Sequence, residues 1–186
     1  MYTRCTTEKS TLQQRQMEQV LLQAMKHEPY ADITVSALCE QAGLSRKTFY
    51  RLFTNKDSVL HALVDHTLMR YMTYHPQERL PVGTLDELHL FFEFWMEERD
   101  LLDVLYQNSL STLLLERSIY YVMNEEPGIL RHFCANSPEN RQEVLLFYVS
   151  GIMSLIISWH QSGYKKTIHQ MADIMRTLML NPPVKI

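Results

Sequence analysis

The chain has 186 residues, enough for one large domain or two small ones with a buried core. Its composition, 46% hydrophobic and 21% charged, is ordinary for a soluble globular protein. The net charge of −3 is unevenly spread. Residues 1–60 hold eight Lys or Arg against six Asp or Glu (+2), and residues 61–186 hold ten against fifteen (−5). Such a distribution suits an N-terminal unit that binds a polyanion and a body that stays away from it.

The sequence gives little indication of a membrane protein or a secreted protein. The most apolar run, residues 144–159, is interrupted by Gly and Ser and is short for a membrane span. The N-terminus lacks the apolar core of a signal peptide. Cys5, Cys39 and Cys134 show neither zinc-ligand spacing nor a disulfide framework. We therefore expect a cytoplasmic protein without membrane contact.

The first expected element is a helix over about residues 10–27. Ser10 and Gln13 form a capping-box pattern at its start, and Pro29 ends it. Apolar residues recur at intervals of three and four, which makes one buried face. These residues are Met17, Val20, Leu21 and Ala24.

Residues 34–60, TVSALCEQAGLSRKTFYRLFTNKDSVL, are predicted to form two short helices and the start of a third. Thr34 can cap the first helix and Ser45 the second, because a hydroxyl oxygen accepts an otherwise unpaired amide hydrogen bond. Gly43 falls where the first helix must stop and the chain must turn with positive φ. Helix, short glycine turn and helix is the helix-turn-helix layout, in which the second helix lies in the DNA major groove.

The outward positions of the second helix carry side chains suited to DNA. Arg46 and Lys47 can reach guanine edges or phosphates. Thr48 can contact a phosphate or a thymine methyl group, and Tyr50 a phosphate. Lys56 falls at the positive N-terminal end of the following helix, where it would add to an anion site. The expected partner is therefore double-stranded DNA.

The same stretch resembles the tetracycline-repressor (TetR) family of bacterial regulators, through the pattern T-V-x-x-L-C-x-x-A-G-L-S-x-x-T-F-Y-x-x-F-x-N-K-x-x-V-L. The resemblance implies two groups of DNA contacts. The phosphate contacts would be Thr34, Thr48, Tyr50 and Lys56, and the base contacts Ser45, Arg46 and Lys47. Many members carry glycine where this chain has Lys47. A long cation there could add a contact, so no member's operator can be transferred.

The rest of the chain has helical periodicity, and strand-like alternation is nearly absent. A helix over about 56–74 leads out of the DNA-binding unit without a flexible Gly/Ser linker, so head and body should be mechanically coupled. Further helices are expected from residue 84, over about 100–109 and 111–124, from 137 to 162 and from 167 to 180. We expect an all-α fold of about nine helices. A three-helix helix-turn-helix domain would occupy residues 1–56, and a regulatory and dimerisation domain residues 57–186.

The last two expected helices are too apolar for the edge of a monomer. One face could cover the core of the body and another face a partner. The TetR resemblance implies that they pair with their twofold copies as a four-helix bundle, and a dimer suits DNA because it reads two half-sites. The expected interface residues are Gly151, Ser154, Leu155, Ser158, Trp159, Met171, Ile174, Met175 and Leu178.

Aromatic residues crowd the body. An aromatic-lined cavity between helices can hold a small apolar effector, and the resemblance places a ligand pocket in this part of the chain. The expected lining residues are Phe91, Phe92, Trp95, Tyr106, Tyr120, Tyr121 and Tyr148. The same residues could instead form a solid core. A body without a cavity would favour a regulator that docks a co-regulator protein, so both alternatives stay open.

Catalytic and metal sites are not expected. The chain has no Ser–His–acid order with a nucleophile turn, no phosphate loop and no paired catalytic carboxylates. His61 and Asp65 lie four residues apart and could share a metal, but no third ligand follows at a fixed spacing. The residues and the resemblance together predict a ligand-responsive transcriptional regulator, most simply a repressor, without cofactor, metal or enzymatic activity.

Overall fold

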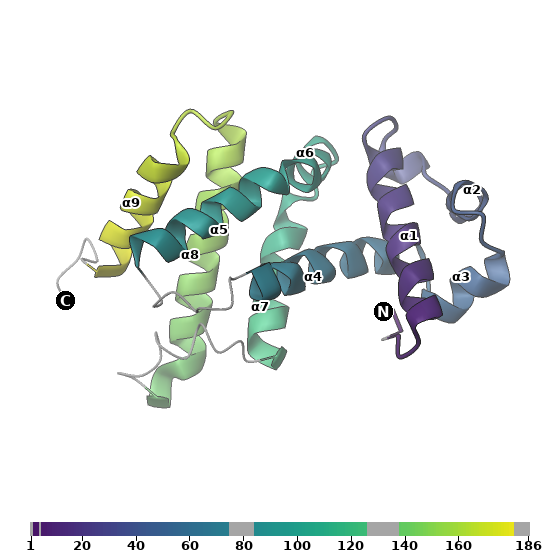
Figure 1. Cartoon of the computed structure of the whole chain (residues 1–186), viewed down its shortest axis with the longest axis horizontal. Helices are drawn as coiled ribbons and strands as arrows, with labels where there is room; N and C mark the ends of the chain where they lie inside the picture. Colours follow the sequence, from purple (N-terminus) through teal and green to yellow (C-terminus); the bar gives the residue numbers. More distant parts are fainter. Residues whose placement is uncertain (1, 4, 75–83, 126–137, 181–186) are drawn as a thin grey trace.

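The computed structural model describes residues 2–3, 5–74, 84–125 and 138–180. The secondary-structure elements in this part are all helices, apart from an isolated β-bridge between Tyr2 and Phe53, which confirms the expected all-α class. Helices α1 (Glu8–Met25), α2 (Val35–Gln41) and α3 (Arg46–Leu52) form a unit at one end of the molecule (Figure 1). Helix α4 (Lys56–Tyr74) runs from this unit into the body.

The body is built from the remaining helices. They are α5 (Leu85–Glu97), α6 (Arg99–Gln107), α7 (Ser111–Glu125), α8 (Arg141–Gln161) and α9 (Ile168–Leu180). Short 3-10 turns, η1 (Tyr30–Asp32) and η3 (Pro138–Asn140), precede α2 and α8. Helix α5 packs on α9 and α7 on α8, while α4 contacts both α1 and α7. Helix α4 thus joins the N-terminal unit to the body, and α1 also contacts α6, where Lys26 pairs with Asp100 at 2.5 Å.

Hydroxyl caps set most of the helix starts. The Thr84 side chain accepts from the amide of Glu87 at the start of α5. At α9, Thr167 and Gln170 exchange side-chain and backbone hydrogen bonds of 2.9 and 3.2 Å, which makes a capping box. Helix α1 is an exception to the prediction. It begins at Glu8 rather than Ser10, because Thr7 Oγ1 accepts from the Ser10 amide at 3.3 Å and is the actual cap.

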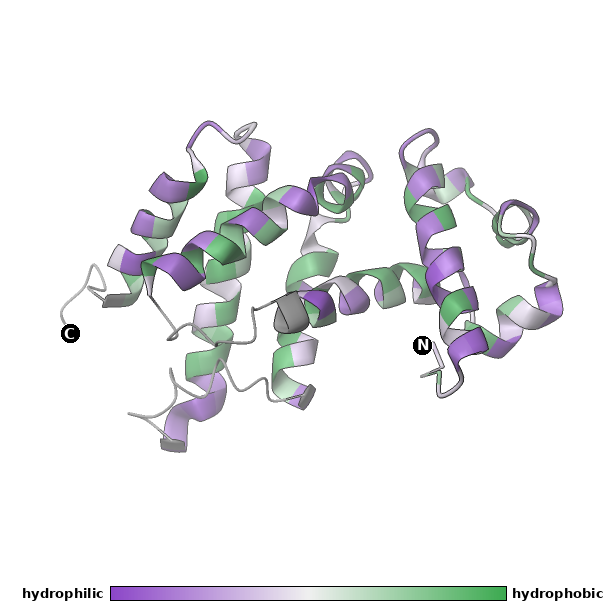
Figure 2. Ribbon diagram, in the orientation of Figure 1, coloured by the Kyte–Doolittle hydropathy of each residue, from purple (hydrophilic) through white to green (hydrophobic). Residues whose placement is uncertain are grey.

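Apolar stripes of the helices face one another across the interior (Figure 2). In the body, the ring of Phe92 on α5 meets the indole of Trp159 on α8 edge to face, with centroids 5.4 Å apart. Trp159 donates its indole N–H to the carbonyl of Lys166 at 2.8 Å, which fixes the turn between α8 and α9. Gly163 takes φ of +67° in that turn, a conformation that side chains rarely adopt.

Candidate nucleic-acid interface

The turn between α2 and α3 is fixed by local hydrogen bonds. Thr34 Oγ1 accepts from the Ala37 amide at 3.2 Å, and Ser45 Oγ accepts from the Thr48 amide at 3.1 Å. Gly43 lies between these caps with φ of +60°. The inner side of α3 is anchored by Phe49, whose side chain is completely buried. The opposite side of α3 is consequently held toward solvent.

That outward side carries most of the predicted DNA contacts. Ser45, Arg46, Lys47 and Tyr50 are exposed, Tyr50 to 61%, and Thr48 is half-buried. Thr34 is exposed at the start of α2.

Two arginines join this face to neighbouring helices. The Arg46 guanidinium donates to Ser36 Oγ in the first turn of α2, so the N-terminal ends of α2 and α3 are neighbours. Arg51 donates to Gln13 Oε1 of α1 at 2.8 Å, adding a third cation to the exposed face of α3. Lys47 makes no hydrogen bond or ion pair with any residue that the structure describes. The result is a basic, hydroxyl-bearing surface with one uncommitted cation.

Lys56 is placed differently from the other predicted contacts. Its ammonium donates to the carbonyl oxygens of Tyr30, Ala31 and Ile33 at 2.5, 3.2 and 2.8 Å. It also lies 4.3 Å from the centroid of the Tyr30 ring. An ammonium has three hydrogens, so all are occupied within the protein. In this structure Lys56 ties the start of α4 to the η1 turn, and a phosphate contact would require it to release one carbonyl.

We expect Lys56→Met to lower the free energy of unfolding by about 2 kcal/mol, since it removes charge-assisted hydrogen bonds to three carbonyls. Chemical denaturation followed by circular dichroism measures the loss. Lys47→Met is the matched control, and its effect should stay within about 0.5 kcal/mol because that side chain is exposed and unpaired. Equal stability of the two variants would show that the Lys56 contacts contribute nothing to the fold.

The seven aromatic residues proposed for a ligand pocket lie in several different surroundings within the described part of the chain. Phe91, Phe92 and Trp95 are at most 6% exposed and belong to the apolar core. Tyr106 is half-exposed and lies against His160, with ring centroids 5.5 Å apart. Tyr148 is partly buried on α8. The remaining two, Tyr120 and Tyr121 of α7, line a hollow on the other side of the body.

This hollow has a volume of about 760 Å³ and lies where Tyr2, Cys5, α1, α4 and α7 meet. We call it the junction cavity. Its centre is an ionic contact that sequence reasoning did not anticipate: Arg117 of α7 donates Nε and Nη2 to the two oxygens of Asp65 on α4, at 2.7 and 2.6 Å. Tyr2 donates its phenol to the same carboxylate at 2.8 Å. These residues are distant in sequence, so no local pattern links them.

The neighbouring ionisable groups are also paired. Glu18 of α1 is 2% exposed and accepts from Arg15 at 3.2 Å, and its other oxygen lies 2.8 Å from His66 Nδ1. Asp65, one of the two residues considered for a metal, is thus engaged by Arg117. Among the described residues, no group of three His, Cys, Asp or Glu could hold a metal ion.

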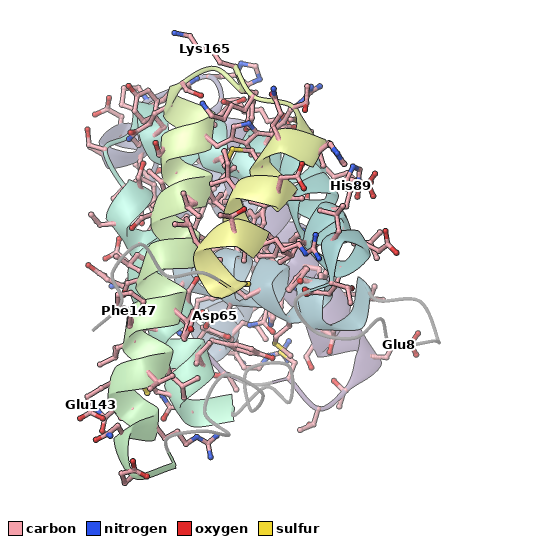
Figure 3. The ribbon with its side chains drawn as sticks, turned by 90° about the vertical axis from the view of Figure 1, so that its left-hand side faces the viewer. Glu8, Asp65, His89, Glu143, Phe147 and Lys165 are labelled. Carbon is pink, nitrogen blue, oxygen red and sulfur yellow. The ribbon has the colours of Figure 1, made fainter. Side chains whose placement is uncertain are left out.

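The C-terminal helices present an uncovered apolar surface. Helix α8 is long and apolar enough to span a membrane, yet only 28% of its most apolar window is buried within the chain. Phe147 is 72% exposed and projects outward from α8 (Figure 3). Gly151, Ser154 and Ser158 are exposed on the same side, Leu155 is half-buried there, and Leu178 of α9 is 42% exposed.

The other predicted interface residues are less accessible. Trp159, Met171 and Met175 are at most 4% exposed and pack inside the chain, and Ile174 is half-buried. The buried three fill the contact of α8 and α9 with α5 rather than the outer surface. The surface left for a partner is centred on α8.

Comparison with known proteins identifies both halves of the chain. Residues 20–63 match the family described as bacterial regulatory proteins, tetR family, and residues 85–181 match one described as transcriptional regulator C-terminal region. No curated protein sequence matches the chain.

Two solved structures share the fold. Lin0861 from Listeria innocua aligns over 94% of this chain and 93% of its own, with a TM-score of 0.68 at 17% identity. The fatty acid degradation regulator FadR from Bacillus halodurans aligns over 98% and 100%, with a TM-score of 0.63 at 14% identity.

Proposed function

Because the chain belongs to the TetR family of transcriptional regulators, we propose that it is a homodimeric repressor that binds a palindromic operator and releases it when a small molecule binds the regulatory domain. Family membership makes the chain a DNA-binding regulator rather than an enzyme. The observation that carries the proposal is the exposed face of α3, where cations and hydroxyls surround the unpaired Lys47. A protein of this kind acts in the cytoplasm, where its operator lies.

The homodimer is supported by the uncovered face of α8. A twofold interface uses the same patch on both subunits, so a row of small residues flanked by apolar ones is suited to close packing against its own copy. Phe147, Gly151 and Leu155 lie at intervals of four along this row. Two heads held by such a dimer would read two half-sites. Sedimentation velocity at micromolar concentration tests the assembly directly.

Selection of bound sequences from random duplex DNA tests the function. The expected result is an inverted repeat whose affinity falls steeply with salt, because phosphate contacts release counterions. Recovery of no preferred sequence, or affinity that does not respond to salt, would contradict the proposal.

A mutational test separates base contacts from phosphate contacts. Lys47→Ala is expected to alter the selected sequence and to cost about 1–3 kcal/mol at one position of each half-site. Tyr50→Phe should weaken binding to all sequences by a similar factor, since phosphates carry little sequence information. Competition binding against single-base operator variants measures both effects. An unchanged preference for Lys47→Ala would remove that residue from the set of base contacts.

A co-regulator protein is the second candidate for the regulatory input. It is favoured by the burial of Phe91, Phe92 and Trp95, which pack against one another and against Trp159 in the apolar core. In that case the α8 surface would bind a partner of different sequence. A stable dimer that buries the surface of Phe147 with its own copy would count against this reading.

A further inference from the structure

The junction cavity has the size and lining of a small-molecule site. Its volume of about 760 Å³ falls in the range of ligand pockets. Tyr120, Tyr121 and Met69 give it an apolar wall, and Cys5 lies at its N-terminal side. The polar lining comes from three helices and the N-terminal residues. These residues are Tyr2, Thr11, Gln14, Arg15, His61, Asp65, His66 and Arg117.

Hydrogen-bond donors are left over in this lining, whereas its carboxylate is satisfied. Both Asp65 oxygens accept from Arg117, and one also accepts from Tyr2. Arg117 Nη1 and the imidazole of His61 make no hydrogen bond with any described residue. Burial lowers the pKa of His61, and the nearby Arg117 charge lowers it further, so the imidazole is neutral at pH 7 and keeps one N–H to donate.

The lining also contains two cations. Arg15 is paired with Glu18 and Arg117 with Asp65, and Arg117 keeps the unused Nη1 donor. Arg117 lies 4.4 Å from the centroid of the Tyr120 ring, so a cation and an aromatic surface are presented together. An anion that accepts hydrogen bonds would pair with Arg117, and a flat apolar part of the same molecule would pack against the Tyr120 ring.

We propose that the junction cavity binds a small aromatic carboxylate, which is the effector of this regulator. The carboxylate accepts from Arg117 Nη1 and His61, and the ring packs against Tyr120 and Tyr121. Charge-assisted hydrogen bonds of this type are the strong ones in a partly buried site. The inference rests on the proposed function, since an effector presupposes a DNA-binding regulator.

The cavity is connected to the end of the recognition helix α3. Thr3 donates its amide to the carbonyl of Leu52 at 2.9 Å and its hydroxyl to the carbonyl of Arg51 at 3.2 Å. The adjacent Tyr2 donates to Asp65 on α4. Residues 2–3 therefore link the C-terminal end of α3 to the carboxylate that Arg117 holds.

An anion that accepts from Arg117 Nη1 lies close to Asp65 and repels it, because both carry negative charge, and this disturbs the link. Such a ligand binds the disturbed state better than the linked state, which is the condition for shifting an equilibrium. Occupation of the cavity therefore lowers operator affinity.

A label attached to Cys5 tests this without knowing the natural ligand. Ellman's reagent forms a mixed disulfide with the thiol and releases one nitrothiobenzoate, so an aromatic carboxylate remains tethered at the cavity. The experiment uses the full chain with Cys134→Ser, a position outside the described residues. Cys39 is buried, and burial raises its pKa, so it reacts slowly.

The label on Cys5 should weaken operator binding at least tenfold, and dithiothreitol should restore it. A benzyl methanethiosulfonate label, which adds a ring without a carboxylate, should have less than a third of this effect. The control for a charge near DNA is the same nitrothiobenzoate label on a Cys5→Ser, Glu8→Cys variant, because Glu8 is exposed on the outside of α1 (Figure 3). That control should change affinity less than twofold. Unchanged affinity on Cys5, or equal effects of the charged and neutral labels, would overturn the proposal.

Binding of free benzoate gives a readout independent of DNA. The arginine Nε–H signal of Arg117, assigned through Arg117→Lys, should shift saturably with a dissociation constant of about 1–5 mM, typical for so small a ligand. Benzamide, which lacks the charge, should leave the signal unmoved. A shift with benzoate in a protein that selects no operator would refute the proposed function but keep the site. If the Arg117 signal does not shift at a benzoate concentration 20-fold above the expected dissociation constant, the site is refuted.

Discussion

Arg117→Leu is expected to lower the free energy of unfolding by about 3–5 kcal/mol, because it leaves a buried carboxylate without its cation. Asp65 is 6% exposed and accepts two hydrogen bonds from Arg117, and among the described residues Tyr2 alone remains as a donor after the substitution. The same hydrogen bonds raise the pKa of Arg117, so its guanidinium stays positively charged. Small domains are stable by only about 5–15 kcal/mol, so this loss is a large fraction of the free energy of unfolding.

A second variant separates the effect of the unpaired Asp65 carboxylate from the effect of lost packing. Asp65→Leu combined with Arg117→Leu removes both charges, and replacement of a buried ion pair by apolar residues is often neutral or stabilising. We therefore expect the double variant to recover most of the stability lost in Arg117→Leu. The measurement is a double-mutant cycle. It compares guanidinium denaturation of the wild type, the two single variants and the double variant. A double variant as unstable as the sum of the single variants would show that the two residues do not interact.

The local part of the DNA-binding unit could be predicted from sequence because its determinants are local. Thr34, Gly43 and Ser45 cap and turn the chain through hydrogen bonds to residues at most five positions away. Their spacing alone therefore predicts two helices and the outward side of the second. Lys56 was predicted from its helix position to meet an anion. Its actual partners, the carbonyls of the η1 turn, lie more than 20 residues earlier and depend on how the chain folds back.

The body was harder to predict because helical periodicity does not state which face turns inward. Trp159 and Ser158 are adjacent on α8, and sequence analysis placed both at a dimer interface. In the structure Trp159 is buried against Phe92 and Ser158 is exposed. Packing against α5 buries the larger apolar side chain, because that removes more apolar surface from water. The Asp65–Arg117 contact spans 52 positions, and neither residue carries a local signal of the other. The junction cavity was therefore beyond sequence reasoning, although Tyr120 and Tyr121 had been placed in a pocket.

Gly151→Arg is expected to weaken the proposed homodimer at least 100-fold without unfolding the subunit. Gly151 is exposed on α8, and a Cβ built there meets no atom within 4 Å, so the isolated chain has room for a side chain. Replacing a helical glycine also improves helix propensity, by up to about 1 kcal/mol. In a twofold interface the residue lies near its own copy. Two arginine side chains would then be forced together at a position where the helices can approach closely only if no side chain is present.

Sedimentation velocity and operator binding together measure this effect. The variant should sediment as a monomer at micromolar concentration, with an unchanged helical spectrum and at least 100-fold weaker operator binding, because a single head reads only one half-site. Gln142→Arg is the matched control, since it adds the same charge at an exposed position two and a half helical turns from Gly151, on the opposite side of α8. That variant should remain dimeric. A dimeric Gly151→Arg variant with full operator affinity would place the interface elsewhere and leave the exposed face of α8 for the co-regulator protein.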